Sequence, residues 1–174
     1  RQGLTTIVNG NCGLSAASFG GAHDAAIRAY LRPITGDIPE TLPAVSMAAY
    51  LAALRALPLH TGMLVGMGTL RAAAAGYELE HLEDAHYRAI HRAMEQALAD
   101  GALGVSLGLG YAPECFCTTE ELLRALAPLR GQDIPLTVHM RQEGAGVCTA
   151  VEEMLTVARP LRIPLHISHL KAMG

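Results

Sequence analysis

The chain has no tryptophan and only 4% aromatic and 17% charged residues, so several classes of protein can be set aside at once. Its 13 lysine and arginine residues are outnumbered by 16 aspartate and glutamate residues, and the formal net charge is −3. This balance offers no basic surface for nucleic acid or for an anionic membrane. No apolar run reaches the roughly 18 residues that a membrane span requires, so we expect neither nucleic acid nor a membrane as partner.

Cysteine and lysine are scarce as well. Four cysteines in 174 residues do not make a disulfide scaffold, and none of them forms a Cys-x-x-Cys pair. Reduced thiols predict a cytoplasmic protein. Lys171 is the only lysine in a chain that otherwise uses arginine, and it lies two residues after a histidine. This placement suggests a selected role for its compact ammonium group.

Apolar residues, by contrast, are abundant. They make up 51% of the chain, and many are alanine, which favours helices. The length suffices for one domain with a sizeable core. Runs of β-branched and apolar residues between glycines and prolines predict strands, and the stretches between them predict helices. The expected strands are 4–8, 62–67, 103–107, 134–139 and 163–168, and the expected helices are 22–31, 44–57, 82–99, 118–129 and 147–158, with a loop at 32–43.

This strict alternation predicts an α/β fold with a parallel sheet and right-handed crossovers. Two architectures fit, a doubly wound sheet or five units of a (β/α)8 barrel. No Gly-x-Gly-x-x-Gly follows the first strand and no Walker sequence is present, which removes the main support for a nucleotide-binding doubly wound sheet. The chain also opens and closes directly on strands, so we expect it to be the middle part of a larger protein.

Three residues with metal-binding side chains stand at or just past the ends of predicted strands. Cys12 follows the first strand, His139 ends the fourth and His169 follows the fifth. Carboxyl ends of parallel strands meet at one edge, and a barrel collects its catalytic groups there. A thiolate and two imidazoles are good zinc ligands, and three protein ligands plus water make a catalytic site. The ordinary alternative is two polar groups at a sheet edge and a small buried hydrophobe.

Two further side chains near this edge are candidates for substrate contact. Tyr111 lies in a glycine-rich loop at 108–113, where it could contact a substrate or simply pack the loop. Arg141 follows His139 by two residues. Its planar guanidinium could clamp a carboxylate, or it could pair with Glu143.

Other chemical-looking residues are interpreted as structural. Ser106 lies in a Gly-x-Ser-x-Gly sequence, but a nucleophile elbow needs a helix directly after the strand, and a loop follows here. Cys115 and Cys117 are spaced awkwardly for a shared tetrahedral ion. His166 lies three residues before His169, so on a strand it faces the other way.

Four segments together resemble a known family, the N-acyl-D-amino-acid deacylases, or D-aminoacylases, of the amidohydrolase superfamily. The resemblance runs from one end of the chain to the other. The segments are GLTTIVNGNCG at 3–13, DGALGVSLGL at 100–109, HMRQEG at 139–144 and ISHLK at 167–171.

The resemblance implies a metal-dependent hydrolase on a (β/α)8 TIM barrel, with residues 1–174 as an incomplete barrel domain holding strands two to six. It implies zinc as cofactor and an N-acyl amino acid as the small-molecule substrate. Cys12 matches the cysteine ligand after the second barrel strand, and His139 and His169 match the histidines that end the fifth and sixth strands. Lys171 matches a residue associated with binding the substrate carboxylate, with Arg141 and Tyr111 as further candidates.

Two parts of the family pattern are absent from the chain. A His-x-His pair is expected before Arg1, and the aspartate that acts as general base is expected beyond Gly174. No catalytic residue is therefore assigned within the chain, and we expect the 174 residues alone to be inactive and to self-associate through open barrel edges.

Two alternative functions stay open. The first is a cyclic amidase similar to dihydroorotase or hydantoinase, although the strand at 103–107 lacks the carboxylated lysine usual in that class. The second is a non-catalytic fragment that keeps the family's sequence without its chemistry.

Overall fold

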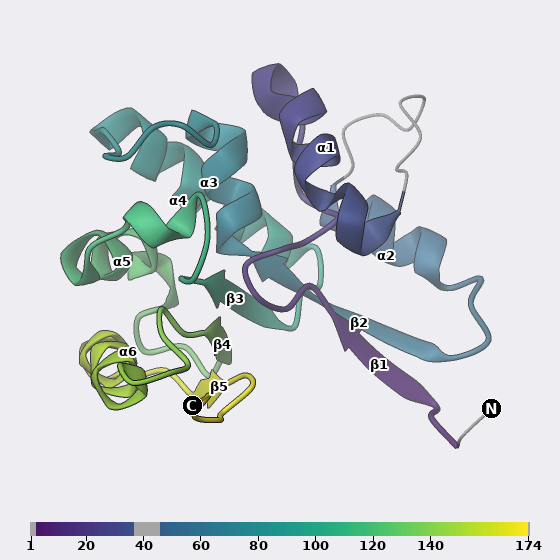
Figure 1. The fold of residues 1–174 in the computed structure, drawn as a ribbon. Coiled ribbons are helices and arrows are strands. Elements are labelled where there is room, and N and C mark those ends of the chain that lie inside the picture. Colours follow the sequence, from purple (N-terminus) through teal and green to yellow (C-terminus); the bar gives the residue numbers. More distant parts are fainter. Residues whose placement is uncertain (1–2, 37–45, 174) are drawn as a thin grey trace.

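Five parallel strands form a single curved sheet in the computed structural model, which describes residues 3–36 and 46–173 (Figure 1). Each strand pairs with the next one along the chain, in the order β1-β2-β3-β4-β5. A doubly wound sheet would reverse its order part-way, whereas a barrel keeps it. The fold is therefore part of a (β/α)8 barrel, as the resemblance implied. The strands are β1 (Thr6–Asn9), β2 (His60–Gly66), β3 (Gly104–Gly108), β4 (Leu136–His139) and β5 (Leu165–Ile167).

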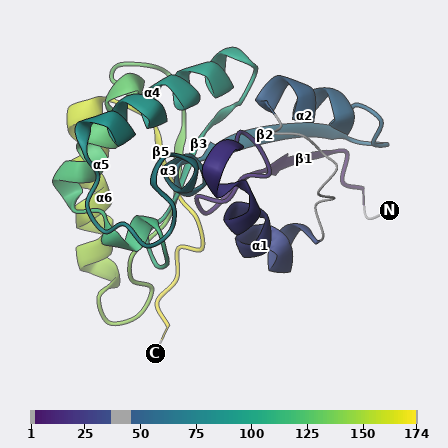
Figure 2. The ribbon, with the colours of Figure 1, turned by 90° about the horizontal axis from the view of Figure 1, so that it is seen from above.

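Helices connect successive strands, and α4, α5 and α6 lie along the outer side of the curved sheet (Figure 2). Helix α3 packs against α4, and α5 packs against α6. The helices are α1 (Asp24–Thr35), α2 (Met47–Leu54), α3 (Met67–Ala75), α4 (Asp84–Ala99), α5 (Thr119–Ala125) and α6 (Val147–Leu161), with short 3-10 turns η1 (Gly21–His23), η2 (Glu114–Phe116) and η3 (Ala127–Leu129).

The core lies between the sheet and these helices, and α4 shows how it forms. Its buried side chains are Tyr87, Ile90, Met94 and Ala97, spaced three or four residues apart on one face. Ile90, Met94 and Ala97 pack in one cluster with strand residues such as Val105, which is fully buried. Burial of this apolar stripe holds the helix on the sheet and leaves the strand ends free for the site.

Helix α5 begins where the sequence predicted. Thr118 Oγ1 accepts a hydrogen bond from the Glu121 N–H at 3.2 Å, and Glu121 Oε2 accepts one from the Thr118 N–H at 2.8 Å. This reciprocal capping box confirms the predicted start and fixes the end of the loop that follows β3.

The sequence prediction missed α3: it ended a strand at Met67 and assigned no element to residues 68–75. Every residue from Met67 to Ala72 is buried, so the segment has no polar face and no periodicity to reveal a helix. Helices α1 and α6 also run further than predicted, because each tolerates a proline, Pro33 and Pro160, in its last turn. Residues 37–43 of the expected loop and 44–45 of the expected helix lie outside the described residues.

In the part of the chain that the structure describes, the two outer strands, β1 and β5, pair on one side only. Within the described ranges, no helix combines the length and the hydrophobicity that crossing a membrane requires.

Candidate metal centre

Cys12, His139 and His169 come together at the carboxyl end of the sheet. Their possible ligand atoms all lie within 4.8 Å of one another. Cys12 Sγ is 3.2 Å from His169 Nε2, and the two imidazole rings have centroids 5.2 Å apart. The structure thus assembles the three residues that the sequence placed at strand ends.

Curvature of the sheet makes this meeting possible. β1 and β5 stand at opposite ends of the strand order, and in a flat sheet four spacings of about 4.8 Å would keep them roughly 19 Å apart. Cys12 lies three residues past the end of β1 and nevertheless touches His169, which lies two residues past the end of β5. The curled barrel segment closes this distance.

Two of the three candidate ligands have an unusual backbone. Cys12 has φ 59° and His169 has φ 51°, both in the left-handed region that side chains other than glycine rarely adopt. Arg162 is the only other non-glycine residue in the described ranges with positive φ. Such conformations persist where surrounding contacts enforce them, and they concentrate at functional sites.

Several hydrogen bonds enforce the turn that carries Cys12. Tyr111 donates its hydroxyl to the Cys12 carbonyl at 2.6 Å. Ser106 Oγ accepts from the Gly13 N–H at 3.0 Å and donates to the Gly10 carbonyl. Ser106 is fully buried and engaged on both sides, which supports the interpretation that it is structural rather than a nucleophile.

Tyr111 packs against two of the candidate ligands, His139 and Cys12. Its ring lies 5.2 Å from that of His139, between centroids, and its hydroxyl is committed to Cys12. Gly108 makes room for this contact, because a Cβ there would lie 2.6 Å from the Tyr111 hydroxyl. The structure therefore favours the packing alternative for Tyr111 over the predicted substrate contact.

Arg141 requires a correction. Its guanidinium donates to both carboxylate oxygens of Glu153 on α6 and to the carbonyls of Cys115 and Cys117, at 2.7–3.3 Å. It does not pair with Glu143, as the sequence alternative supposed. Four of its five N–H donors are thus engaged with α6 and the η2 loop, an arrangement that holds the loop and leaves no pair of donors for a bidentate clamp on a substrate carboxylate.

Lys171 lies beside the ligands and faces solvent, with a side chain 47% exposed. Its ammonium donates to Glu143 Oε2, and Glu143 Oε1 lies 3.8 Å from His139 Nδ1. The hydrogen bond from Lys171 holds the pKa of Glu143 below its ordinary value. Glu143 thereby links the cationic side chain to a candidate ligand.

The electrostatics of the three donors suit a metal ion. Burial lowers the pKa of His139, which favours the neutral imidazole that ligates metals. Burial raises the pKa of the Cys12 thiol, so a thiolate at this position needs a positive partner. Zinc bonds of roughly 2.0–2.3 Å place tetrahedral ligand atoms about 3.3–3.8 Å apart, and the observed spacing fits that range with small side-chain movements.

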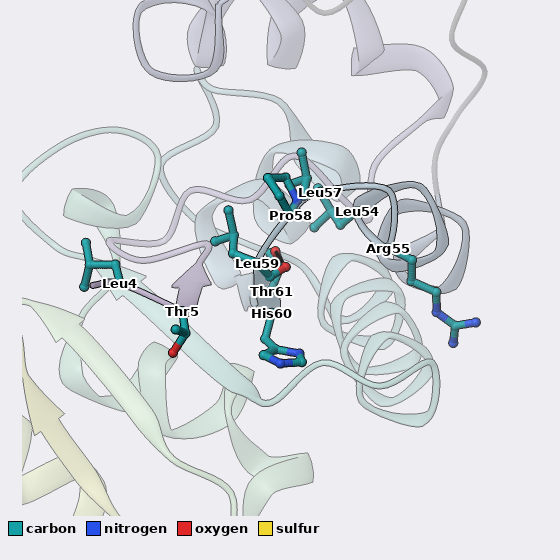
Figure 3. Close-up of a pocket in the computed structure, with 9 residues that line it drawn as sticks. All are labelled: Leu4, Thr5, Leu54, Arg55, Leu57, Pro58, Leu59, His60 and Thr61. Atoms are coloured by element: carbon teal, nitrogen blue, oxygen red, sulfur yellow. Dashed lines mark hydrogen bonds between the residues drawn. The ribbon is translucent and has the colours of Figure 1, made fainter. Parts of the chain in front are cut away.

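Other sequence candidates lie away from this cluster. Cys117 is buried in the core, and burial raises its pKa to about 11. His166 on β5 is exposed, as its position on the strand predicted. A cavity of about 600 Å³ lies at the amino ends of β1 and β2, opposite to the candidate ligands, with Leu4, His60 and Thr61 among its lining (Figure 3). Within the described part of the chain, the one group of possible metal ligands lies at the other end of the sheet.

The sequence prediction missed Glu114. Its carboxylate is 1% exposed and accepts a hydrogen bond from the Gly108 N–H at 3.0 Å. Burial raises its pKa to about 8. Nothing in the local sequence pattern distinguishes this glutamate from a solvated loop residue.

Known proteins resemble this chain over nearly its whole length, although no protein-family model matches it. Over 175 residues it is 37% identical to the D-aminoacylase of Alcaligenes xylosoxydans xylosoxydans, covering 99% of this chain and 35% of that protein. It is 33% identical over 176 residues to the N-acyl-D-aspartate deacylase of the same organism, covering 99% and 34%.

Solved structures agree. A crystal structure of D-aminoacylase, described as defining a subset of amidohydrolases, superposes with a TM-score of 0.84 at 34% identity, covering 99% of this chain and 36% of that one. Over nearly its whole length the chain is similar to the D-aminoacylases. The N-acyl-D-glutamate deacylase of Bordetella bronchiseptica, solved with zinc and a phosphonate inhibitor, is another D-aminoacylase-like neighbour, with a TM-score of 0.81, 33% identity and coverage of 99% and 35%. The chain spans about a third of the length of these D-aminoacylase relatives.

Proposed function

We propose that this chain supplies the metal centre of a zinc-dependent hydrolase that removes the acyl group from N-acyl-D-amino acids. The convergence of Cys12, His139 and His169 within 4.8 Å carries the proposal. The chain is similar over 99% of its length to D-aminoacylase, to N-acyl-D-aspartate deacylase and to N-acyl-D-glutamate deacylase. This similarity supports the reaction class. The zinc in the related N-acyl-D-glutamate deacylase supports the choice of metal.

The three ligands would hold the ion through one thiolate and two imidazole nitrogens. Bound there, zinc supplies Lewis acidity toward an amide carbonyl and lowers the pKa of a water molecule toward neutrality. The turn after β1 would hold the Cys12 sulfur in place. The Glu143 carboxylate lies beside Nδ1 of His139, where a carboxylate can orient a ligating imidazole.

Lys171 would bind the α-carboxylate of the substrate. It is the only lysine in the chain, its ammonium lies beside Glu143 and hence near His139, and it is half exposed to the edge where a substrate would arrive. Arg141 is occupied elsewhere, so we assign the carboxylate contact to Lys171 alone among the described residues. Fixing the carboxylate there orients the amide toward the ligand cluster.

Location in the cytoplasm and self-association belong to the same proposal. All four cysteines are free in the structure, as in a reducing compartment. Among the described residues, β1 and β5 each leave one edge unpaired, and two apolar side chains are exposed there, Leu4 just before β1 and Val8 within it. We therefore expect the isolated chain to elute as a dimer or larger species in size-exclusion chromatography, and a monomer would contradict this part.

Zinc content by elemental analysis tests the metal centre. The purified chain should retain about one zinc ion, and Cys12→Ser and His169→Ala should each lose it. Cys148→Ser and His166→Ala are matched controls, because both residues are exposed and outside the cluster. A folded wild-type chain without zinc, or equal loss in the controls, would overturn the assignment of ligands.

Hydrolysis is then assayed on the natural protein that carries this sequence, with N-acetyl-D- and N-acetyl-L-amino acids in parallel. Release of free amino acid from the D-compounds alone is expected, with loss in His169→Ala. Hydrolysis of dihydroorotate or a hydantoin instead would favour a cyclic amidase, and no hydrolysis of either class would favour a non-catalytic protein.

A further inference from the structure

Glu114 is buried where a carboxylate is costly to bury. It begins η2, in the loop between β3 and α5, and it is 1% exposed. Its Oε1 has no hydrogen-bond partner among the described residues. The positive charge that acts on it is that of the fully buried Arg71 of α3, whose guanidinium donates its hydrogen bonds to the carbonyls of Leu79 and Glu80. Burying a charged group usually costs stability, so the position requires an explanation.

Three glycines from separate segments surround the carboxyl group, two by leaving space for it and one by a hydrogen bond. A Cβ at Gly13, after β1, would lie 1.9 Å from Glu114 Oε2, and a Cβ at Gly68, in α3, would lie 2.4 Å from it. The third, Gly108 at the end of β3, donates its N–H to the same oxygen at 3.0 Å. The carboxyl group therefore fills the space where the turn after β1, the start of α3 and the end of β3 meet.

This junction carries the strained Cys12. Gly13 is its direct neighbour, and the Gly13 carbonyl accepts a hydrogen bond from the Thr69 N–H at 3.1 Å. Gly108 packs closely against Cys12, since a Cβ at Gly108 would be 2.3 Å from the Cys12 carbonyl oxygen. A side chain that occupies the space between Gly13 and Gly108 keeps the turn from collapsing inward, and so keeps the sulfur at the edge of the sheet.

We infer that Glu114 is a positioning residue for Cys12: wedged against Gly13 and bonded to Gly108, it holds the turn that presents the thiolate to the metal. The inference rests on the proposed metal centre. Its physical content is that Gly13 and Gly108, the glycines against which the Glu114 carboxyl group lies, hold the left-handed backbone of Cys12 in place.

Replacement of Glu114 tests the inference. Glu114→Ala removes both the side chain that fills the space and the hydrogen-bond acceptor, and Glu114→Asp withdraws the carboxyl group by one methylene while keeping the group itself. Glu95→Ala, on the exposed face of α4, is the matched control. Zinc affinity is measured by competition with a chromophoric chelator, and Co²⁺ is used in place of zinc to observe the thiolate-to-metal charge-transfer band.

Glu114→Ala should bind zinc about 10–100-fold more weakly and should weaken the thiolate band, as expected when a supporting residue behind a ligand is lost. Glu114→Asp should show the same changes to a smaller extent, and Glu95→Ala should match the wild type. Unchanged affinity and an unchanged band in a folded Glu114→Ala protein would overturn the inference. If the alanine variant does not fold, Glu114→Asp decides in the same way.

Hydrogen exchange gives a readout that needs no metal. The amides of Gly13 and Gly108 should exchange faster in Glu114→Ala, while those of α6 keep wild-type rates. Exchange rates at Gly13 and Gly108 that equal those of the wild type would overturn the inference. If the wild-type chain binds no zinc, the metal centre is wrong while this measurement still decides the role of Glu114.

Discussion

Cys12 Sγ lies 3.2 Å from His169 Nε2, although 157 positions separate the two residues along the chain. Both residues also adopt the left-handed backbone conformation. A contact across the full width of a five-stranded sheet, made by two strained residues, is easiest to understand if the two side chains share a ligand. The residues packed beneath and beside this contact should therefore show measurable effects when they are replaced.

Ser106 should matter for stability and not as a nucleophile. Ser106→Ala leaves the Gly13 N–H and the Gly10 carbonyl without their partner, in a buried environment. We expect the free energy of unfolding to fall by about 1–3 kcal/mol, measured by urea denaturation. A serine-directed fluorophosphonate should not label the wild-type chain, and stoichiometric labelling at Ser106 would contradict this role.

Lys171 and Arg141 should separate into a binding residue and a structural one. Lys171→Met should weaken binding of an N-acyl-D-amino acid to the natural protein at least roughly tenfold, since it removes the charge opposite the carboxylate. The unfolding free energy should change by less than about 0.5 kcal/mol, because the Lys171 side chain is half exposed.

Arg141→Met is the contrasting variant. It leaves the Glu153 carboxylate and two carbonyls of the η2 loop without donors, so we expect a loss of about 1–3 kcal/mol in stability. Calorimetric titration with substrate analogue, run beside urea denaturation, distinguishes the two effects. Equal losses of binding at equal stability in both variants would restore Arg141 as a carboxylate clamp.

The sequence predicted the strands, and placed the three candidate ligands at one edge of the sheet, because both inferences depend on local pattern. Apolar runs bounded by glycine identify the strands, and a histidine or cysteine at the end of a parallel strand lies at a known edge of the sheet. The prediction from sequence was less accurate for residues whose role depends on partners far away in the chain. Arg141 was expected to clamp a carboxylate or to pair with Glu143, two residues away, whereas its partner Glu153 reaches it from the next helix.

Glu114 illustrates the same limit more strongly. A glutamate after a proline in a loop has the local signature of a solvated residue, and its burial is visible only when Gly13, Gly68 and Gly108 are brought together by the fold. The helix α3 was missed for a related reason, since a segment buried on all sides carries no amphipathic pattern.

The pH dependence of stability should report the burial of Glu114. Burial raises its pKa from 4.5 to about 8, opposed by the Gly108 N–H and by Arg71, while Cys12 and Tyr30 also face it. Between these two values the folded protein holds a proton that the unfolded chain releases. This contribution to stability is therefore complete below about pH 4.5 and is lost as the pH rises toward 8, by up to about 1.4 kcal/mol per unit.

Glu114→Gln cannot ionise and should remove this dependence. In urea denaturation between pH 5 and pH 9, the unfolding free energy of the variant should rise relative to that of the wild type up to about pH 8. Above that pH the difference between the two should stay constant. Glu95→Gln, at an exposed position, should follow the wild-type curve throughout. Parallel curves for Glu114→Gln and the wild type would show that the carboxyl group is not held in its neutral form.

The glycine at position 68 should be required only while Glu114 is present. In the wild type, a methyl group at this position would lie 2.4 Å from Glu114 Oε2, with the Gly13 carbonyl oxygen at 2.9 Å as the next obstacle. Gly68→Ala should therefore destabilise the chain by about 1–3 kcal/mol, as overpacking of a core does. In a Glu114→Ala background the methyl group enters vacated space, and alanine favours the helix, so the same substitution should cost less than about 1 kcal/mol.

A double-mutant cycle isolates this coupling, because the two side chains touch directly. Equal costs of Gly68→Ala in both backgrounds would mean that the Gly13 carbonyl, and not the carboxyl group, excludes a side chain there. A smaller cost in the Glu114→Ala background, together with slower exchange of the Gly13 amide than in Glu114→Ala alone, would show that filling the junction is what holds the turn. The methyl group introduced by Gly68→Ala would then fill part of the space left by the Glu114 side chain. The double variant should therefore bind zinc more tightly than Glu114→Ala alone.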